Sequence, residues 1–379
     1  MPLVLNEEQR MLRDSTRDFL RDNANTQHFR ALRDSDTRQA CDPETWARMA
    51  ELGLSAITAP EQYGGLAFGY LALGSVFEEC GQLLTATPML SSVVLSGSLI
   101  ELAGNEEQKE ALLPSITAGE SIIASAIDEG PHHSPLATAL IARQEGDQYI
   151  LNGCKAFVID GMSADKVIVL ARTSGEAGEQ HGLSLFVLDS VVEGLQRNRS
   201  KLVDSRDYAD IELSDVAVSN SALLGNRDDA FPALDAALDR ARACLAAEML
   251  GGAQHLFDRT VAYLKEREQF GAKIGSFQAL QHRAAKMYVE LELTRSAVVD
   301  ALSAIDEERN TSAACVSTAK CRANDTFQLI ANEAVQMHGG IGVTDELDVG
   351  LYFKRCRVSL QLLGNSGFHK NRFALLNNF

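Results

Sequence analysis

Arg267-Glu-Gln-Phe-Gly-Ala-Lys-Ile-Gly-Ser-Phe-Gln278 lies between two long stretches of helical pattern, residues 235–265 and 278–305. Its two glycines and its lack of proline predict a short ordered loop between two helices. Arg267 offers a planar fork of donors that suits a phosphate or pyrophosphate. Phe270 offers a flat aromatic face, and Gln278 offers amide donors and acceptors at the start of the next helix. From these residues alone, an ordinary helix–helix connection with a surface arginine remains an open alternative.

The N-terminal third of the chain, residues 1 to about 120, has the pattern of helices. Asn6 suits the N-cap position of the first helix. Pro43 stands at the first position of a later one, where its missing N–H is tolerated. Further helical patterns cover residues 71–84 and 91–103. We therefore expect an N-terminal helical domain.

From residue 121 the pattern changes to short β-strands. Asn152-Gly153 stands inside an apolar stretch and predicts a hairpin turn. We expect an antiparallel β domain that ends near Leu224, followed by helices to the C-terminus, including one from Thr311 to His338. The expected strands cover residues 122–126, 148–158, 166–171, 183–188 and 209–213.

Composition and charge exclude several classes of protein. The chain has 379 residues, enough for two or three domains, and a net charge of −17, which disfavours nucleic acid and anionic membranes as partners. The seven cysteines form no CxxC pair, so no metal site and no disulfide framework is expected, and a reducing cytoplasm is the simplest location. The N-terminus lacks the pattern of a signal peptide, and no apolar run reaches about 18 residues.

A second segment, Gln336-Met-His-Gly339-Gly340-Ile-Gly342 with Asp345-Glu346, follows the first in order. Together with Arg267-x-Gln269-Phe270-Gly271 it resembles the acyl-CoA dehydrogenase family, and the likeness covers the whole chain in outline. The resemblance implies an α+β protein with an N-terminal helical domain (1–120), a middle antiparallel β-barrel-like domain (121–225) and a C-terminal four-helix bundle (226–379).

In that family both segments bind the FAD of the neighbouring subunit. The resemblance therefore implies that this chain contributes residues to an FAD shared across a subunit interface. The residues that it assigns to FAD are Arg267, Gln269, Phe270, Gln278, Gln336, Gly339 and Gly340.

The family also holds the flavin ring of its own subunit, through a Thr-Glu-Pro-x-x-Gly-Ser-Asp run and a Trp-x-Thr/Ser step. Here the first run reads Asp128-Glu-Gly-Pro-His-His-Ser134-Pro, so the threonine position has become Asp128. At the second, Phe157 stands for the tryptophan and Ile159 for the hydroxyl residue. Phe157 and Ser134 keep some capacity for flavin contact, whereas Ile159 cannot hydrogen-bond the ring.

The catalytic base of the family, a glutamate, is missing from both positions known for it. Leu363 occupies the C-terminal position, in Leu363-Gly364-Asn365, and Ala241 occupies the helical position directly before Arg242. Glu248, two helical turns after Ala241, is a weak candidate for a relocated base, and a structural carboxylate paired with an arginine is the alternative. Glu129 and the pair His132-His133 are further candidates, although the two histidines have the character of exposed loop residues.

The altered positions serve a subunit's own flavin, and the retained ones serve a neighbour's. This asymmetry predicts the non-catalytic subunit of a heteromeric α₂β₂ acyl-CoA dehydrogenase, with a homologous catalytic partner, an acyl-CoA substrate and an electron-transfer flavoprotein-like acceptor. Split enzymes of this family are associated with bulky CoA thioesters, such as steroid side chains and dicarboxylates. Two alternatives stay open: a homo-oligomeric enzyme that uses Glu248, and a binding or regulatory protein without redox chemistry.

Overall fold

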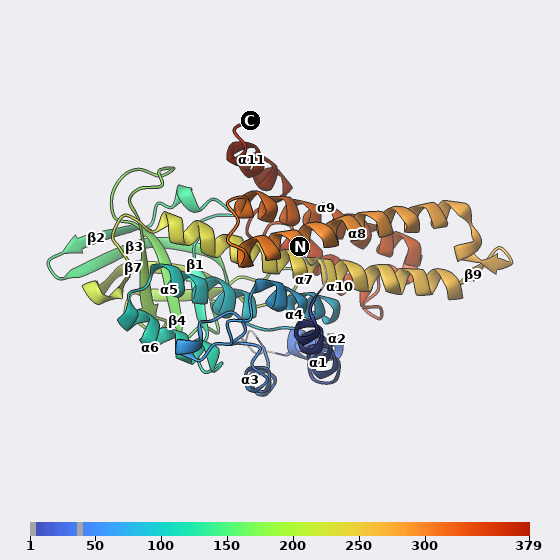
Figure 1. Ribbon diagram of the computed structural model, residues 1–379, viewed down its shortest axis with the longest axis horizontal. Helices are drawn as coiled ribbons and strands as arrows, with labels where there is room; N and C mark the ends of the chain where they lie inside the picture. Colours follow the sequence, from blue (N-terminus) through green and yellow to red (C-terminus); the bar gives the residue numbers. More distant parts are fainter. Residues whose placement is uncertain (1–4, 36–40) are drawn as a thin grey trace. The chain divides into compact units, whose positions relative to one another are not determined.

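The structure is a computed structural model that describes residues 5–35 and 41–379 (Figure 1). The chain forms two compact units. The first, here called the helical unit, consists of residues 5–31, 70–85 and 242–379, and the second, the sheet unit, consists of the remaining described residues. The boundary between them falls within two helices, α2 (Thr26–Asp34) and α7 (Phe231–Glu266).

The starts of several helices follow local sequence rules. Asn6 caps α1 through a capping box in which its side chain accepts from the Gln9 N–H and the Gln9 side chain accepts in return. Asn105 builds the same capping box on α6, and Pro43 opens α3, as the sequence predicts. The remaining helices are α1 (Glu7–Asn23), α3 (Pro43–Glu51), α4 (Tyr70–Leu83), α5 (Gly97–Ala103), α6 (Glu106–Thr117), α8 (Gln278–Asp306), α9 (Ser312–His338), α10 (Val349–Ser359) and α11 (Ser366–Leu376).

Short helical turns complete the helical segments. The predicted helix over residues 91–103 divides into a π-helical segment, η2 (Met89–Ser96), and α5. The 3₁₀ turns are η1 (Glu61–Tyr63), η3 (Pro135–Ala137), η4 (Asn220–Ala222), η5 (Ile274–Ser276) and η6 (Gly339–Val343).

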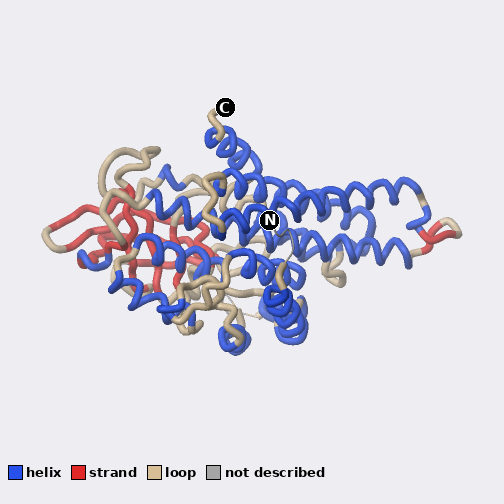
Figure 2. Tube along the Cα trace, in the orientation of Figure 1, coloured by secondary structure: helices blue, strands red, loops and turns tan. Residues whose placement is uncertain are grey.

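The sheet unit contains an eight-stranded sheet (red in Figure 2) in the order β6-β7-β3-β2-β4-β5-β8, with β1 paired to β4. Most neighbours are antiparallel, as expected, but β1 pairs with β4 in parallel, and so does β2 at Ile141↔Arg172. The strands are β1 (Ile123–Ala126), β2 (Ile141–Glu145), β3 (Gln148–Ile159), β4 (Lys166–Arg172), β5 (Leu183–Asp189), β6 (Leu195–Arg199), β7 (Tyr208–Ser219) and β8 (Leu223–Leu224).

The predicted hairpin turn at Asn152-Gly153 was wrong. These residues lie inside β3, and the turn joining β2 to β3 is at Gly146, which has a φ of +64°. Asn152 bonds Asp215 on β7 through both its amide groups, and the register between β3 and β7 shifts beside Gly153. The dipeptide therefore forms a bulge, because the sheet supplied partners that a free hairpin turn would lack.

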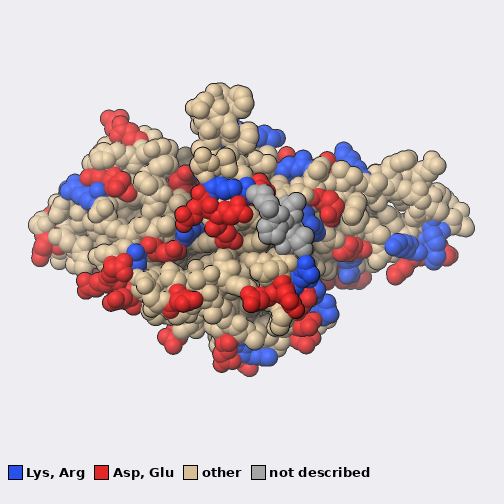
Figure 3. All heavy atoms as spheres, viewed as in Figure 1, with Lys and Arg blue, Asp and Glu red and all other residues tan. Residues whose placement is uncertain are grey.

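The core of the sheet unit consists of the inward side chains of its strands, including Leu151, Val167, Val169, Phe186 and Ile211. In the described part of the chain, no helix combines the length and the apolar character needed to cross a membrane. Within the same residues, no three His, Cys, Asp or Glu side chains gather in a way that could hold a metal ion. On the face drawn in Figure 3, acidic and basic side chains are interspersed.

Candidate functional site

The segment after α7 forms a small hairpin of β9 (Glu268–Gln269) and β10 (Ala272–Lys273), visible at the end of α7 and α8 in Figure 1. Its two turn residues, Phe270 and Gly271, both have positive φ, +54° and +77°. This is the backbone of a two-residue type I′ turn, which a glycine at the second position favours. The turn leaves Phe270 93% exposed, in edge contact with Phe277 at 6.3 Å between ring centroids.

The end of α9 carries the second signature segment. Gly339 has φ +66° and ψ −141°, a conformation that is essentially restricted to glycine. A Cβ atom at Gly339 or at Gly340 would meet nothing within 4 Å, so the backbone here is open to a ligand.

Contacts between the helices bring the two segments to the same end of the helical unit. The Tyr263 ring on α7 stacks on the His338 ring of α9 with 4.4 Å between centroids. The carbonyl of Tyr263 accepts the N–H of Arg267 at 2.9 Å. On α8, Arg283 forms an ion pair with Glu333 of α9 at 2.5 Å. These contacts gather residues that lie far apart in the sequence, as the predicted FAD contribution requires.

The side chains at this end are exposed and available. Within the described residues, the side chains of Arg267, Gln278 and Gln336 have no hydrogen-bond or ion-pair partner, whereas the Gln269 amide donates to the Glu268 carbonyl at 2.9 Å. A free guanidinium fork is well suited to a pyrophosphate, and exposed amides are suited to a nucleotide. This end therefore fits the phosphate and adenine portions of FAD.

In the sheet unit, residues 128–135 correspond to the family's flavin loop, and here Asp128 bonds other residues of the same loop. The Asp128 carboxylate accepts from His133 Nδ1 at 2.8 Å and from the Ser134 N–H at 2.9 Å. Burial raises the pKa of Asp128, but the His133 and Ser134 hydrogen bonds outweigh it and hold the pKa below its ordinary value. The His133 side chain is only 2% exposed, so its prediction as an exposed loop residue was wrong, while His132 is exposed.

Glu129 is occupied by structural contacts. Its two carboxylate oxygens accept the N–H groups of Ala139 and Leu140 at 2.8 and 2.9 Å, and Lys155 Nζ lies 2.8 Å from Oε1. Lys155 is fully buried, and this burial lowers its pKa to about 8, opposed by the charge of Glu129. A carboxylate held in this way stabilises the loop and is a poor candidate for a base.

Phe157 lies half-buried on β3 with a φ of +54°, and its N–H donates to Asp210 at 3.0 Å. Ile159, two residues on, has no polar group to offer a flavin. Ser134 is exposed. The surroundings of a flavin ring in this unit therefore comprise one aromatic face and a carboxylate that is already bonded.

At the C-terminal position known for the base, the chain forms an ordered loop that has no acidic side chain. Leu363 is buried with a φ of +56°, and its carbonyl is 3.2 Å from Arg242 Nε and 3.2 Å from His369 Nε2. The next carbonyl, of Gly364, accepts from Lys320 Nζ at 3.2 Å. The loop is thus held by buried cations although it carries no group that can remove a proton.

Lys320 had no place in the sequence prediction. It is completely buried on α9 and donates to Asn324, Ser359 and Gly364. Burial, with a smaller effect of the Arg242 charge, lowers its pKa to about 7. A lone lysine in an alanine-rich helix gives no signal of this position, because two of its three acceptors, the Ser359 and Gly364 carbonyls, lie about forty residues later in the chain.

The helical base position and the relocated candidate are both buried. Ala241 is fully buried, and Glu248 is 4% exposed. Glu248 lines a void too small to admit a water molecule, together with Arg355 and Phe327. A base must reach the proton that it removes. This void offers no space for a substrate, so the geometry favours the structural alternative for Glu248.

Comparison with known proteins identifies the family. Residues 6–120, 122–216 and 231–374 match the N-terminal, middle and C-terminal domains of the acyl-CoA dehydrogenase family, respectively. The chain is 31% identical to the mitochondrial isovaleryl-CoA dehydrogenase of Pongo abelii, over 93% of this chain and 85% of that one. It is a member of the acyl-CoA dehydrogenase family, whose enzymes are flavoprotein oxidoreductases that act on CoA thioesters.

Solved structures agree with this assignment. The acyl-CoA dehydrogenase of Geobacillus kaustophilus is 28% identical, with a TM-score of 0.91 and 99% of both chains covered. The ChsE4-ChsE5 complex of Mycobacterium tuberculosis contains a chain that is 25% identical, with a TM-score of 0.89, covering 100% of this chain and 99% of that one. The predicted fold class, helical then β then helical, is confirmed.

FAD is the cofactor of this family, and the two regions to which the resemblance assigns its contacts differ in the groups that they offer. The end of the helical unit fits the nucleotide portion, because the side chains of Arg267, Gln278 and Gln336 are exposed and have no partner among the described residues. The sheet-unit loop does not fit the flavin ring equally well, since Asp128 is bonded to His133, Glu129 is bonded to Lys155 on β3, and Ile159 offers no hydrogen bond.

Proposed function

We propose that this chain is the non-catalytic subunit of a heteromeric acyl-CoA dehydrogenase of the α₂β₂ type. It supplies Arg267, Gln278, Gln336 and the Gly339-Gly340 backbone to an FAD whose ring is held by a homologous catalytic partner. The partner supplies the glutamate that removes the proton next to the thioester carbonyl. FAD supplies the acceptor for the hydride when bound.

One observation carries the proposal: the groups available to a neighbour's cofactor are free, while those around the chain's own flavin position are already bonded. Arg267 is exposed and without a partner among the described residues. Asp128 and Glu129 have bonded partners, and Leu363 replaces the base. A general loss of function would alter both sets of residues, whereas here the residues available to a neighbour's cofactor are retained.

Similarity to a chain of the ChsE4-ChsE5 complex supports a heteromer, because that assembly joins two different proteins. A catalytic role for this chain alone would need a base, and the buried position of Glu248 argues against it. An electron-transfer flavoprotein-like acceptor and a bulky acyl-CoA, such as a steroid side-chain thioester, complete the proposal.

Expression of the chain alone and together with the product of its neighbouring gene provides the test. We expect the isolated chain to carry no flavin and to have no activity, and the pair to purify as a yellow, active complex. Yellow and active protein from this chain alone would refute the proposal.

The variant Arg267→Ala tests the assigned residue within the complex. Loss of a charge-assisted hydrogen bond of about 1.5–3 kcal/mol predicts an FAD affinity about 10–100-fold weaker, measured by flavin release on dilution. Arg143→Ala is the matched control, because Arg143 is an exposed arginine of β2 whose partner is the nearby Glu145. Equal retention of flavin in both variants would contradict the role of Arg267.

A further inference from the structure

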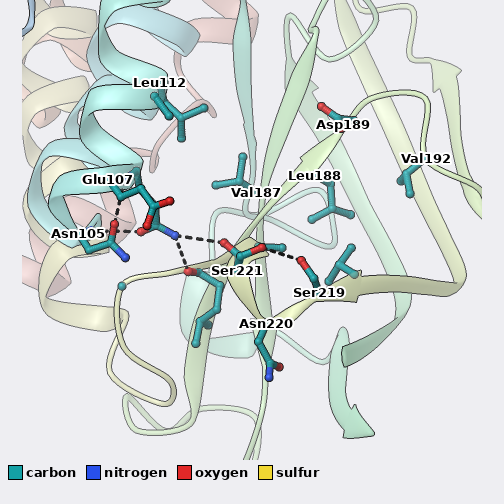
Figure 4. Close-up of a pocket in the computed structure, with 16 residues that line it drawn as sticks. Asn105, Glu107, Leu112, Val187, Leu188, Asp189, Val192, Ser219, Asn220 and Ser221 are labelled. Atoms are coloured by element: carbon teal, nitrogen blue, oxygen red, sulfur yellow. Dashed lines mark hydrogen bonds between the residues drawn. The ribbon is translucent and has the colours of Figure 1, made fainter. Parts of the chain in front are cut away.

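A groove in the sheet unit contains none of the candidate FAD-binding or base residues discussed above. It has a volume of about 590 Å³ and lies between α6, the end of β5 and the segment from the end of β7 to β8 (Figure 4). Leu112 on α6 and Val187 on β5 project from opposite walls (Figure 4). Val192, Val218 and Leu223 add to its apolar lining.

The groove contains an open sheet edge. β5 pairs with β4 along its whole length, but on its other side β8 pairs only with Leu185 and Phe186. The Leu183 carbonyl points away from β4, because it accepts the N–H of Ala230. Backbone polar groups of every second residue in a strand point to the same side, so the N–H and C=O of Val187 also point away from β4. Ala222, which would oppose Val187 if the register continued, belongs to η4 instead.

A side chain from α6 keeps this edge open. Gln108 donates to the carbonyls of Leu223 at 2.7 Å and Ser221 at 3.3 Å. Its own N–H and side chain are fixed by the Asn105 capping box. Residues before β8 are therefore tied toward α6, and the edge beyond Phe186 stays without a strand.

The charges of the groove select its occupant. Its sixteen lining residues include Glu107 and Asp189 and no lysine or arginine. Glu107 is exposed, and the Asp189 side chain is 65% exposed although Lys166 pairs with it. These acids disfavour a small anion, and the net charge of −17 disfavours a second copy of this chain.

We propose that this groove binds an extended segment of another protein as an added strand on β5, a segment in which basic side chains stand two residues before and two residues after an aliphatic one. The main chain of the segment bonds Val187, its aliphatic side chain enters between Leu112 and Val187, and its basic side chains, on the same face of the strand, lie near Glu107 and Asp189. Strand addition to an open edge gives affinity through the main chain and specificity through alternate side chains. The proposal is independent of the flavin and of the subunit partner.

The probe is a fluorescein-labelled seven-residue synthetic peptide with valine at its centre, lysine two residues before and after it and threonine elsewhere, titrated against the purified full-length chain by fluorescence polarisation. We expect saturable binding, with slower hydrogen exchange in residues 183–192. The same peptide methylated on alternate amide nitrogens should bind at least about tenfold more weakly, because it cannot pair with the edge. Equal binding of both peptides would overturn the proposal.

Two double variants separate recognition from general attraction to an acidic protein. Glu107→Gln with Asp189→Asn should weaken binding about five- to tenfold. Glu145→Gln with Glu176→Gln removes the same charge from exposed positions outside the groove and should leave the affinity unchanged. Equal losses in both pairs would show non-specific attraction and would also overturn it.

Val187→Pro tests the edge itself. Proline removes the N–H that faces the groove and is tolerated on a free edge, because the ladder to β4 uses the neighbouring residues. An unchanged melting temperature with peptide affinity at least about tenfold lower supports the added strand. A folded variant that binds the peptide as the wild type does refutes it.

Discussion

At the end of the helical unit, Arg267, Gln278 and Gln336 are exposed and have no partner among the described residues. In the sheet unit, Asp128 bonds His133, and Glu129 bonds the buried Lys155. Water solvates the exposed groups, so they can bond a ligand without breaking a contact within the chain, whereas the two carboxylates already have partners. This difference is the basis of the division of roles proposed above.

The largest effect is expected when Lys155, the β3 residue that pairs with Glu129, is replaced. Lys155→Met leaves the Glu129 carboxylate without its buried cation and should lower the free energy of unfolding by about 3–5 kcal/mol. Arg267→Ala at the exposed end should change it by less than about 0.5 kcal/mol. Urea unfolding followed by circular dichroism measures both.

The double variant Glu129→Gln with Lys155→Met is the control. It removes the uncompensated charge, so it should recover part of the lost stability. A loss below about 1 kcal/mol in Lys155→Met would show that the loop does not depend on this pair.

The buried lysine beneath the vacant base position makes a pH-dependent prediction. The pKa of Lys320 is about 7 in the folded chain, against 10.5 for an ordinary lysine. The unfolded chain therefore binds more protons than the folded chain between pH 7 and 10.5. The free energy of unfolding should rise with pH across this window, by on the order of a few kcal/mol relative to Lys320→Met.

Unfolding of the wild type and of Lys320→Met at several pH values in this window measures the difference. Lys273→Met is the control for the loss of one lysine charge, because the Lys273 side chain lies half exposed at the hairpin beside Glu268. A difference for Lys320→Met that stays flat, or falls with rising pH, would contradict the assigned direction.

A matched pair of glycines tests the backbone at the exposed end. Gly339→Ala should destabilise by about 1–2 kcal/mol, because alanine is strained at φ +66° and ψ −141°. Gly340→Ala, with equal open space and no positive φ, should stay within about 0.5 kcal/mol. Thermal unfolding compares them, and equal effects would show that the bend at Gly339 carries no special constraint.

The smallest effect is expected at Glu248. In the complex with the catalytic partner, Glu248→Gln should change turnover by less than about threefold, because a general base is worth roughly 10²–10⁴-fold. Steady-state kinetics of the complex gives the number. A loss of a hundredfold or more would restore Glu248 as the base and would remove the division of labour proposed here.

Prediction from the sequence succeeded where signals were local or repeated. Asn6 and Pro43 correctly predicted the starts of α1 and α3. Apolar residues at helical spacing correctly predicted the three long helices α7, α8 and α9. It failed at Asn152-Gly153, where β7 supplied a partner to the asparagine side chain. It also missed β2 and β6, because Ile141–Glu145 and Leu195–Arg199 are mostly polar and lack a buried alternation.

The amino-acid sequence by itself determined the family, the order of the domains and the absence of an acid at Leu363 and Ala241, because these depend on which residues are present. Only the tertiary structure decided which polar groups are free and which are bonded. His133 and Lys320 look like ordinary surface residues in the sequence, yet both side chains are buried against acceptors. The Ser359 and Gly364 carbonyls that bond Lys320 lie about forty residues later in the chain, so no local pattern could reveal this pairing.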